Sequence, residues 1–133
     1  MVYNCTIEKN NEMLIVQFPD MPNIQTFGHT KEEALAMAKD ALEGCLESDI
    51  SRGLPVPPPA YKKGYPVTVA NHIALSLMLR NLRGEQSQTD IARKLGLSYQ
   101  AYQRLENPRK ANPTVKTLEK IARVYGRELT ISL

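Results

Sequence analysis

The opening part of the chain alternates apolar and polar positions in a way that predicts short strands. Residues 2–7 place three apolar side chains on one side, the pattern of a half-buried strand. Residues 13–18 form a more continuous apolar run after the polar turn 9–12, so the two strands are expected to pair as a hairpin. A turn with two prolines precedes a third short strand at 24–27.

From Thr30 onward the apolar spacing lengthens to that of a helix. Thr30 and Glu33 have the spacing of a capping box, and the helix is expected to end near Arg52. Its apolar stripe consists of Leu35, Ala38, Leu42 and Cys45 or Leu46. Residues 54–60, LPVPPPA, exclude a helix and predict a stiff extended segment, either a spacer or edge segment or a ligand for a proline-binding partner. With a fourth strand at 65–69, residues 1–69 predict an α+β unit of order β-β-β-α-β.

The remainder of the chain has helical spacing almost throughout. A helix at 70–83 has Ile73, Leu77 and Leu82 among its inner positions. Residues 87–106 predict two short helices capped by Ser87 and Ser98 and separated by Gly96, a residue that tolerates the positive φ of a helix end. Thr114 caps a last helix, with Leu118, Ile121, Ala122 and Tyr125 inside, which ends at Gly126. The alternation in 129–133 then predicts a C-terminal strand.

Composition limits the class of protein. A chain of 133 residues fits one ordinary domain or two small ones. Its longest apolar-leaning run, 73–82, is far shorter than the roughly 20 residues of a membrane span. No basic and then apolar segment stands at the N-terminus to suggest export, so a cytoplasmic protein with two reduced, buried cysteines is expected.

Charge is unevenly distributed along the chain. Residues 1–60 hold 4 Lys+Arg against 9 Asp+Glu, a balance of −5, whereas residues 61–133 hold 13 against 5, a balance of +8. Such asymmetry suggests two domains with different partners. The basic half suits nucleic acid, and the acidic half suits a cationic partner or serves solubility.

The second of the two short helices carries the clearest chemistry. Tyr102 and Leu105 form its inner face, which leaves Tyr99, Gln100 and Arg104 pointing outward together with Gln103. Glutamine can present a donor and an acceptor to adenine, and arginine can hold guanine with two hydrogen bonds. The alternative is a helical hairpin with an ordinary polar face.

The stretch from Leu82 to Gly126 resembles the Cro and phage-repressor class of helix–turn–helix proteins. The resemblance rests on Gln88, Ile91-Ala92, Leu95-Gly96-Leu97-Ser98, Leu105-Glu106-Asn107 and Pro113, all in register. It departs from the class at Tyr102 and Pro108. It implies that Gln88 touches a phosphate and that the positions of Tyr99, Gln100 and Arg104 meet base edges. The candidate DNA-binding residues are Gln88, Thr89, Ser98, Tyr99, Gln100, Gln103, Arg104, Asn107, Arg109 and Lys110.

The front half shows no catalytic constellation. His29 and His72 lack an acidic or nucleophilic companion at a motif spacing, and no glycine-rich phosphate loop is present. Two cysteines and two scattered histidines are too few for a metal site. We therefore expect no enzyme, no catalytic residue, no cofactor and no metal. A one-component repressor whose front half senses a small molecule is an alternative that the residues leave open.

The front half resembles the HicB family of antitoxins. The resemblance rests on Phe18-Pro-Asp-Met-Pro22, Thr26-x-Gly28-x-Thr30, Glu33-Ala34, Ala38-Lys-Asp-Ala-Leu42 and the proline-rich 55–59, and it covers residues 2–60. It implies a partial RNase-H-like fold without a working active site. It also implies a partner, a small basic HicA-type toxin that cleaves mRNA, and no membrane association.

Together the resemblances predict an acidic toxin-binding domain at 1–69 and a basic helix–turn–helix domain at 70–133 that represses its own operon on operator double-stranded DNA. The candidate toxin-binding residues are Phe18, Asp20, Met21, Glu47 and Asp49. An unpaired apolar strand at 129–133 is expected to pair with its counterpart in a second subunit, giving a homodimer or higher homo-oligomer.

Overall fold

The computed structural model describes all 133 residues and divides the chain into two units. The N-terminal unit is Met1–Ala74 and the C-terminal unit is Leu75–Leu133. The division falls within helix α2 (Asn71–Arg83), so the first turn of this helix belongs to the N-terminal unit. The sequence had placed the whole of this helix in the second domain.

The N-terminal unit contains a four-stranded antiparallel sheet, which confirms the α+β class and the order of elements. Its strands are β1 (Val2–Asn10), β2 (Met13–Gln17), β3 (Gln25–Gly28) and β4 (Tyr65–Thr68), arranged in the order β3-β2-β1-β4. The predicted hairpin is confirmed, with Asn10 opposite Met13 at its closed end. The further implication of the resemblance, a partial RNase-H-like fold, stays a prediction.

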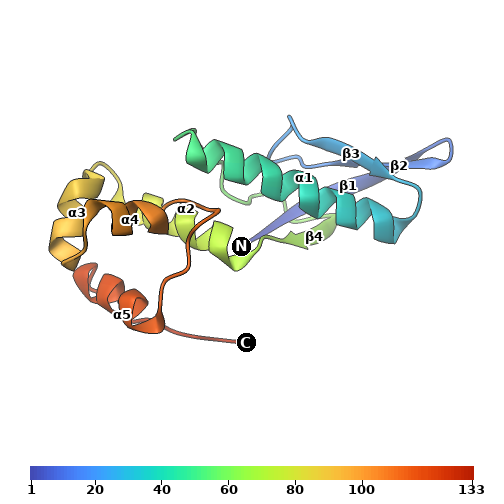
Figure 1. The fold of residues 1–133 in the computed structure, drawn as a ribbon. Helices are drawn as coiled ribbons and strands as arrows, with labels where there is room; N and C mark the ends of the chain where they lie inside the picture. The colour runs from blue at the N-terminus through green and yellow to red at the C-terminus, as the bar shows by residue number, and fades with distance from the viewer. The chain divides into compact units, whose positions relative to one another are not determined.

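Helix α1 (Lys31–Ser51) lies along one face of this sheet (Figure 1). The Thr30 hydroxyl accepts a hydrogen bond from the Glu33 backbone N–H at 3.1 Å, which confirms the predicted N-cap. The buried face of the helix consists of Ala34, Ala38, Leu42, Leu46 and Ile50. Leu35 was predicted on this face but is half-buried, because β3 approaches the helix so closely at Gly28 that the smaller Ala34 takes the contact.

The proline-rich segment after α1 is held against its own unit. The Tyr3 hydroxyl donates to the Pro57 carbonyl at 2.6 Å, and the Asp20 carboxylate accepts the backbone N–H groups of Ala60 and Tyr61 at 3.0 Å. These contacts join residues that are 40 or more positions apart in sequence. They favour the role of a structural edge segment over that of a free ligand for a proline-binding partner.

The C-terminal unit is helical. After α2 come α3 (Gln88–Leu95), α4 (Tyr99–Leu105) and α5 (Val115–Val124), and each of the three begins at its predicted cap: Ser87, Ser98 and Thr114. Gly96 has φ +67°, the left-handed conformation expected at the turn. The core of the unit contains Leu79, Ile91, Ala92, Leu95, Tyr102, Leu105 and Ile121. Ile73, Leu77 and Ile121 are buried as predicted, whereas Leu82, Leu118, Ala122 and Tyr125 are only half-buried.

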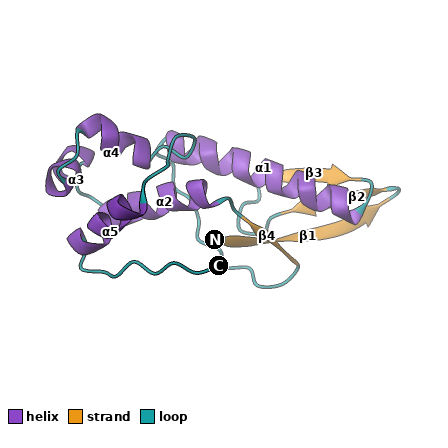
Figure 2. Cartoon of the chain, turned by 60° about the horizontal axis from the view of Figure 1, so that its bottom comes forward, coloured by secondary structure: helices purple, strands orange, loops and turns teal.

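The predicted C-terminal strand is absent. Residues 127–133 run as exposed chain beyond α5 (Figure 2) and form no ladder with any other segment. A strand requires a neighbour to receive its backbone hydrogen bonds, and this segment has none within its own chain. Leu129, Ile131 and Leu133 are consequently exposed to solvent.

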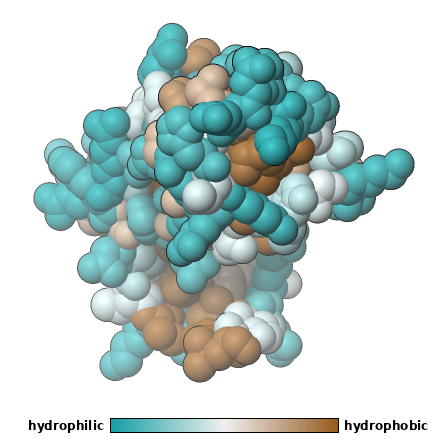
Figure 3. Space-filling view, turned by 90° about the vertical axis from the view of Figure 1, so that its right-hand side faces the viewer, coloured by the Kyte–Doolittle hydropathy of each residue, from teal (hydrophilic) through white to brown (hydrophobic).

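None of the helices is both long enough and apolar enough to cross a membrane. Hydrophilic residues cover most of the face drawn in Figure 3, and the hydrophobic ones on it gather in a few separate groups.

Candidate functional site

The α3–turn–α4 segment is a rigid support for an exposed helix face. The Leu97 N–H bonds to the Ala92 carbonyl at 2.9 Å and closes the turn. Below the turn, Ile91 and Leu95 of α3 are fully buried beside Tyr102 of α4, in the same hydrophobic cluster. Because this face is packed, the opposite face of α4 is fixed in orientation and available to a ligand.

The predicted DNA-binding residues lie at the start of α3, on α4 and at its N-cap, and in the loop that follows α4. Exposed are Thr89, Ser98, Tyr99, Gln100, Gln103, Arg104, Arg109 and Lys110, and half-buried are Gln88 and Asn107. Ser98 is occupied as the N-cap of α4, its hydroxyl accepting the Ala101 N–H at 3.1 Å. Tyr99 is 43% exposed, although tyrosine is often buried, and it begins the exposed face.

Asn107 organises the loop between α4 and α5. Its side-chain oxygen accepts the Arg109 N–H at 3.0 Å, and its carbonyl accepts the N–H of Lys110 at 3.0 Å and of Ala111 at 2.9 Å. Pro108, the departure from the helix–turn–helix class, is among the fully buried side chains. The turn therefore holds two exposed cations, Arg109 and Lys110, next to the end of α4, where they suit phosphate groups.

A buried charged cluster under this face was not predicted. The Glu106 carboxylate accepts two hydrogen bonds from the Arg83 guanidinium, at 2.7 Å from Nε and 3.0 Å from Nη2, and a third from Gln88 Nε2 at 3.2 Å. The hydrogen bond to Glu106 raises the pKa of Arg83. Burial, with the Glu106 carboxylate as a further cause, raises the pKa of Tyr102. The sequence does not reveal the contact, because Gln88 and Arg83 lie 18 and 23 positions before Glu106.

The predicted toxin-binding residues do not form one surface. Phe18 is fully buried and Met21 is 2% exposed, so neither side chain can touch a partner directly, and both are corrected to core residues of the N-terminal unit. Phe18 directly follows β2, and the Met21 N–H donates to the Phe18 carbonyl at 2.9 Å in the turn between β2 and β3. Asp20 holds the proline-rich segment, and Glu47 and Asp49 are half-buried on α1.

Helix α1 carries more carboxylates than the predicted Glu47 and Asp49. Six of the nine acidic residues in 1–60 lie on this helix: Glu32, Glu33, Asp40, Glu43, Glu47 and Asp49. Glu33, Asp40 and Glu47 are seven residues apart, which is close to two helical turns, so they share one side of the helix. Spacings of seven could have revealed this row in the sequence.

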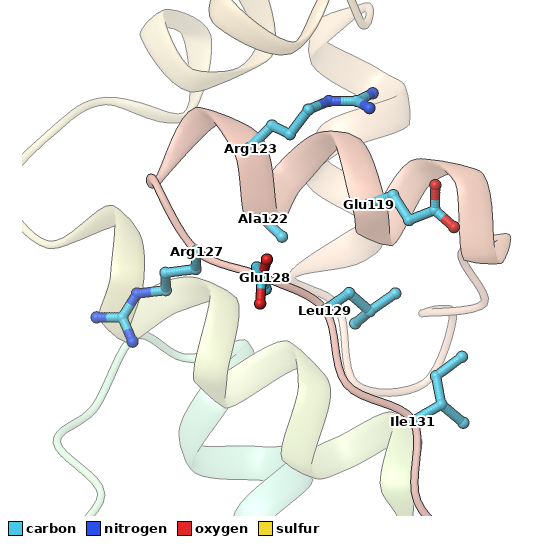
Figure 4. A pocket seen from close by; sticks show the side chains of 7 residues that line it. All are labelled: Glu119, Ala122, Arg123, Arg127, Glu128, Leu129 and Ile131. Carbon is cyan, nitrogen blue, oxygen red and sulfur yellow. The ribbon is translucent and has the colours of Figure 1, made fainter.

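The other end of the chain offers a second kind of surface. Glu119, Ala122 and Arg123 of α5 line a shallow pocket with the segment that follows the helix (Figure 4). That segment contributes Arg127, Glu128, Leu129 and Ile131. Leu129 and Ile131 project to the same side of the segment, so charges of both signs border exposed apolar side chains.

Comparison with known proteins gives two matches that divide the chain at nearly the same place as the structure. Residues 2–77 match the family described as HicB_like antitoxin of bacterial toxin-antitoxin system, and residues 79–131 match the helix-turn-helix family. Antitoxin HicB 1 of Photorhabdus laumondii is 33% identical over 139 residues, which include all of this chain and 87% of the relative.

Two further relatives are also named as HicB antitoxins. Antitoxin HicB 2 of Photorhabdus laumondii is 36% identical over 79% of this chain and 77% of its own length. Antitoxin HicB of Escherichia coli K12 is 30% identical over 88% of this chain and 87% of its own length. The chain therefore belongs to the HicB-like family of bacterial antitoxins, with a helix-turn-helix as its second unit.

Proposed function

We propose that this protein neutralises a small, basic, mRNA-cleaving toxin of the HicA type through its N-terminal unit. Through its C-terminal unit it binds operator DNA and represses its own operon. The observation that carries the proposal is the row of exposed polar and aromatic side chains on α4, set in a basic unit that is joined to an acidic one.

The charges of the two units support this division of work. Met1–Ala74 holds 6 Lys+Arg against 9 Asp+Glu, a balance of −3, and Leu75–Leu133 holds 11 against 5, a balance of +6. A toxin that binds RNA must be cationic where it holds phosphates. An acidic unit can cover that surface and accelerate the encounter, whereas a basic unit suits DNA.

The decisive experiment is co-expression of the chain with a short basic open reading frame adjacent to its gene. A stable complex in a pull-down, rescue of growth, and a gel shift with the upstream region of the operon are the expected results. Absence of both toxicity and complex would contradict the antitoxin role. If the protein shifts the operator DNA but the open reading frame yields neither toxicity nor a complex, a one-component repressor that senses a small molecule would be favoured.

The row of Glu33, Asp40 and Glu47 on α1, of which Glu47 is half-buried, is the proposed docking surface for the toxin. Asp40→Lys and Glu47→Lys should each weaken toxin binding by slowing association, most strongly at low salt, because the charge on this row is reversed. Glu12→Lys, the same charge change in the β1–β2 turn, is the matched control. Equal effects of all three variants would indicate net charge alone and would contradict a docking row on α1.

A homodimer through α5 and residues 127–133 is the proposed assembly. Leu129, Ile131 and Leu133 are exposed, and the neighbouring Glu119 and Arg123 provide both signs of charge, as a surface that meets its own copy requires. Deletion of Leu129–Leu133 should convert the dimer into a monomer in analytical ultracentrifugation and weaken operator binding. An unchanged oligomeric mass would contradict this assembly.

A further inference from the structure

The carboxylate of Glu106 lies where three helices end or begin. Glu106 is the C-cap of α4, Arg83 is the last residue of α2, and Gln88 is the first residue of α3. Glu106 is 7% exposed, and its Oε1 accepts hydrogen bonds from both Arg83 Nη2 and Gln88 Nε2. One oxygen atom therefore connects the half-buried guanidinium of Arg83 to the side chain of the first residue of α3.

Arg83 holds Glu106 in a fixed orientation. Its guanidinium forms the two-pronged contact with the carboxylate, and its remaining nitrogen, Nη1, donates to the Gln86 carbonyl at 2.7 Å. A planar guanidinium with five N–H donors fixes a carboxylate more rigidly than a single charge would. The carboxylate is thus locked before any ligand arrives.

The contact with Glu106 decides how the Gln88 amide is turned. An ionised carboxylate only accepts hydrogen bonds, so the amide must present its nitrogen and not its oxygen. Gln88 is half-buried, so part of its side chain remains accessible. With one N–H used by Glu106, the second N–H of Nε2 is available to a phosphate oxygen, and the amide is already in the required orientation.

Stability alone is a weak reason for such a pair. Burying an arginine and a carboxylate costs desolvation that their attraction barely offsets, and apolar replacements of similar size are often as stable. A buried pair that also fixes a surface side chain has a second use.

We propose that Glu106 is a positioning residue for DNA binding, which orients Gln88 toward the DNA backbone and is itself held by Arg83. This rests on the proposed operator binding. The contact is to a phosphate, so it contributes equally to operator and random DNA. Because glutamine is uncharged, it contributes nothing to the counterions released on binding.

The test is a double-mutant cycle in the full-length protein, with affinities measured on operator and on random DNA over a range of salt. In Glu106→Gln the new amide can turn toward Gln88 with either end, so the orientation of Gln88 is lost. Glu106→Gln and Gln88→Ala should each weaken both complexes by the same factor, roughly 3- to 10-fold, the worth of about one hydrogen bond. The salt slope should stay that of the wild type, and the double variant should bind no worse than Gln88→Ala alone.

Gln100, an exposed glutamine on α4, provides the matched control. In the double variant Gln100→Ala/Glu106→Gln, the fold-loss of DNA affinity should equal the product of the two single fold-losses. Additive losses between Glu106→Gln and Gln88→Ala, or unimpaired binding by Glu106→Gln, would overturn the proposal. Failure of the wild type to prefer operator over random DNA would instead overturn the proposed function, so the two failures are distinguishable.

Folding is monitored by thermal melting of each variant. Where Glu106→Gln alone does not fold, the cycle is repeated in Arg83→Met/Glu106→Gln, which removes both buried charges together. The same non-additivity with Gln88→Ala is expected in that background. If this background is also unfolded, the pair is needed for the fold, and the positioning role is overturned.

Discussion

Asp20 illustrates how a single residue can be assigned a role that only distant contacts reveal. It lies in a turn between strands, where both turn formation and an acidic contact with a partner were open to it. Its carboxylate accepts the backbone N–H groups of Ala60 and Tyr61, so it fixes the proline-rich segment to the N-terminal unit. The observed role of Asp20 is therefore structural.

Asp20→Ala should lower the free energy of unfolding by about 1–3 kcal/mol, because two backbone N–H groups lose their acceptor. Urea unfolding of the full-length protein measures the loss. Glu12→Ala, an exposed acidic residue of the same unit, should change stability little. A stable Asp20→Ala variant that no longer binds the toxin would contradict this structural role and would favour a direct contact between Asp20 and the toxin.

Tyr102 makes the protein sensitive to alkaline pH. Burial raises the pKa of Tyr102 in the folded state, whereas the pKa of tyrosine in an unfolded chain is about 10. Above that pH the unfolded state binds fewer protons than the folded state, so stability is complete below pH ~10 and falls as the pH rises further. Tyr102→Phe should make this decline shallower in urea unfolding, by up to about 1.4 kcal/mol per pH unit. An identical decline in both proteins would contradict the assignment.

Arg104 is the residue whose removal should change specificity. If it meets a guanine, Arg104→Ala costs about 1–3 kcal/mol on the operator and relaxes the choice of base at one position. Lys110→Ala, in the basic loop, should instead weaken operator and random DNA alike. Binding-site selection with each variant separates the two results, and a uniform loss for Arg104→Ala would make it a phosphate contact.

At the scale of elements, the sequence predicted most of the fold because helices and short strands are specified locally. Ser87, Ser98 and Thr114 cap their helices as the spacing indicates, and Gly96 adopts the required positive φ. Long-range partners could not be predicted in this way. The strand order β3-β2-β1-β4 and the pairing of Arg83 with Glu106 depend on residues brought together only by the fold.

Two glycines should respond oppositely to the same substitution. A Cβ at Gly28 would lie 2.5 Å from the Ala34 backbone nitrogen, so Gly28→Ala must push α1 away from β3 and should destabilise the unit by at least about 1–3 kcal/mol. Gly44, within α1, has open space around it, and Gly44→Ala should stabilise by up to about 1 kcal/mol. Thermal melting of both variants tests the packing, and a neutral Gly28→Ala would contradict it.

At the scale of the whole molecule, the sequence predicted the part of the candidate site that lies on one helix. It missed the part that is formed by residues distant in sequence. The exposed face of α4 follows from helical spacing, so Tyr99, Gln100 and Arg104 lie where expected. Phe18 and Met21 were predicted to bind the toxin because they belong to a motif, yet both are buried. A single sequence does not distinguish a motif residue that packs in the core from one that contacts a partner.

Helix α2 begins in one unit and ends in the other, with Ile73 buried near its start and Leu79 in the core of the C-terminal unit. The chain that joins the two units is therefore hydrogen-bonded backbone, whereas proteases need an extended, accessible strand of chain. Trypsin should cleave at exposed sites such as Arg52 and Lys63, which lie outside the helices, before it cleaves at Arg80. Separating the two units by cleavage within α2 would therefore require local unwinding of this helix.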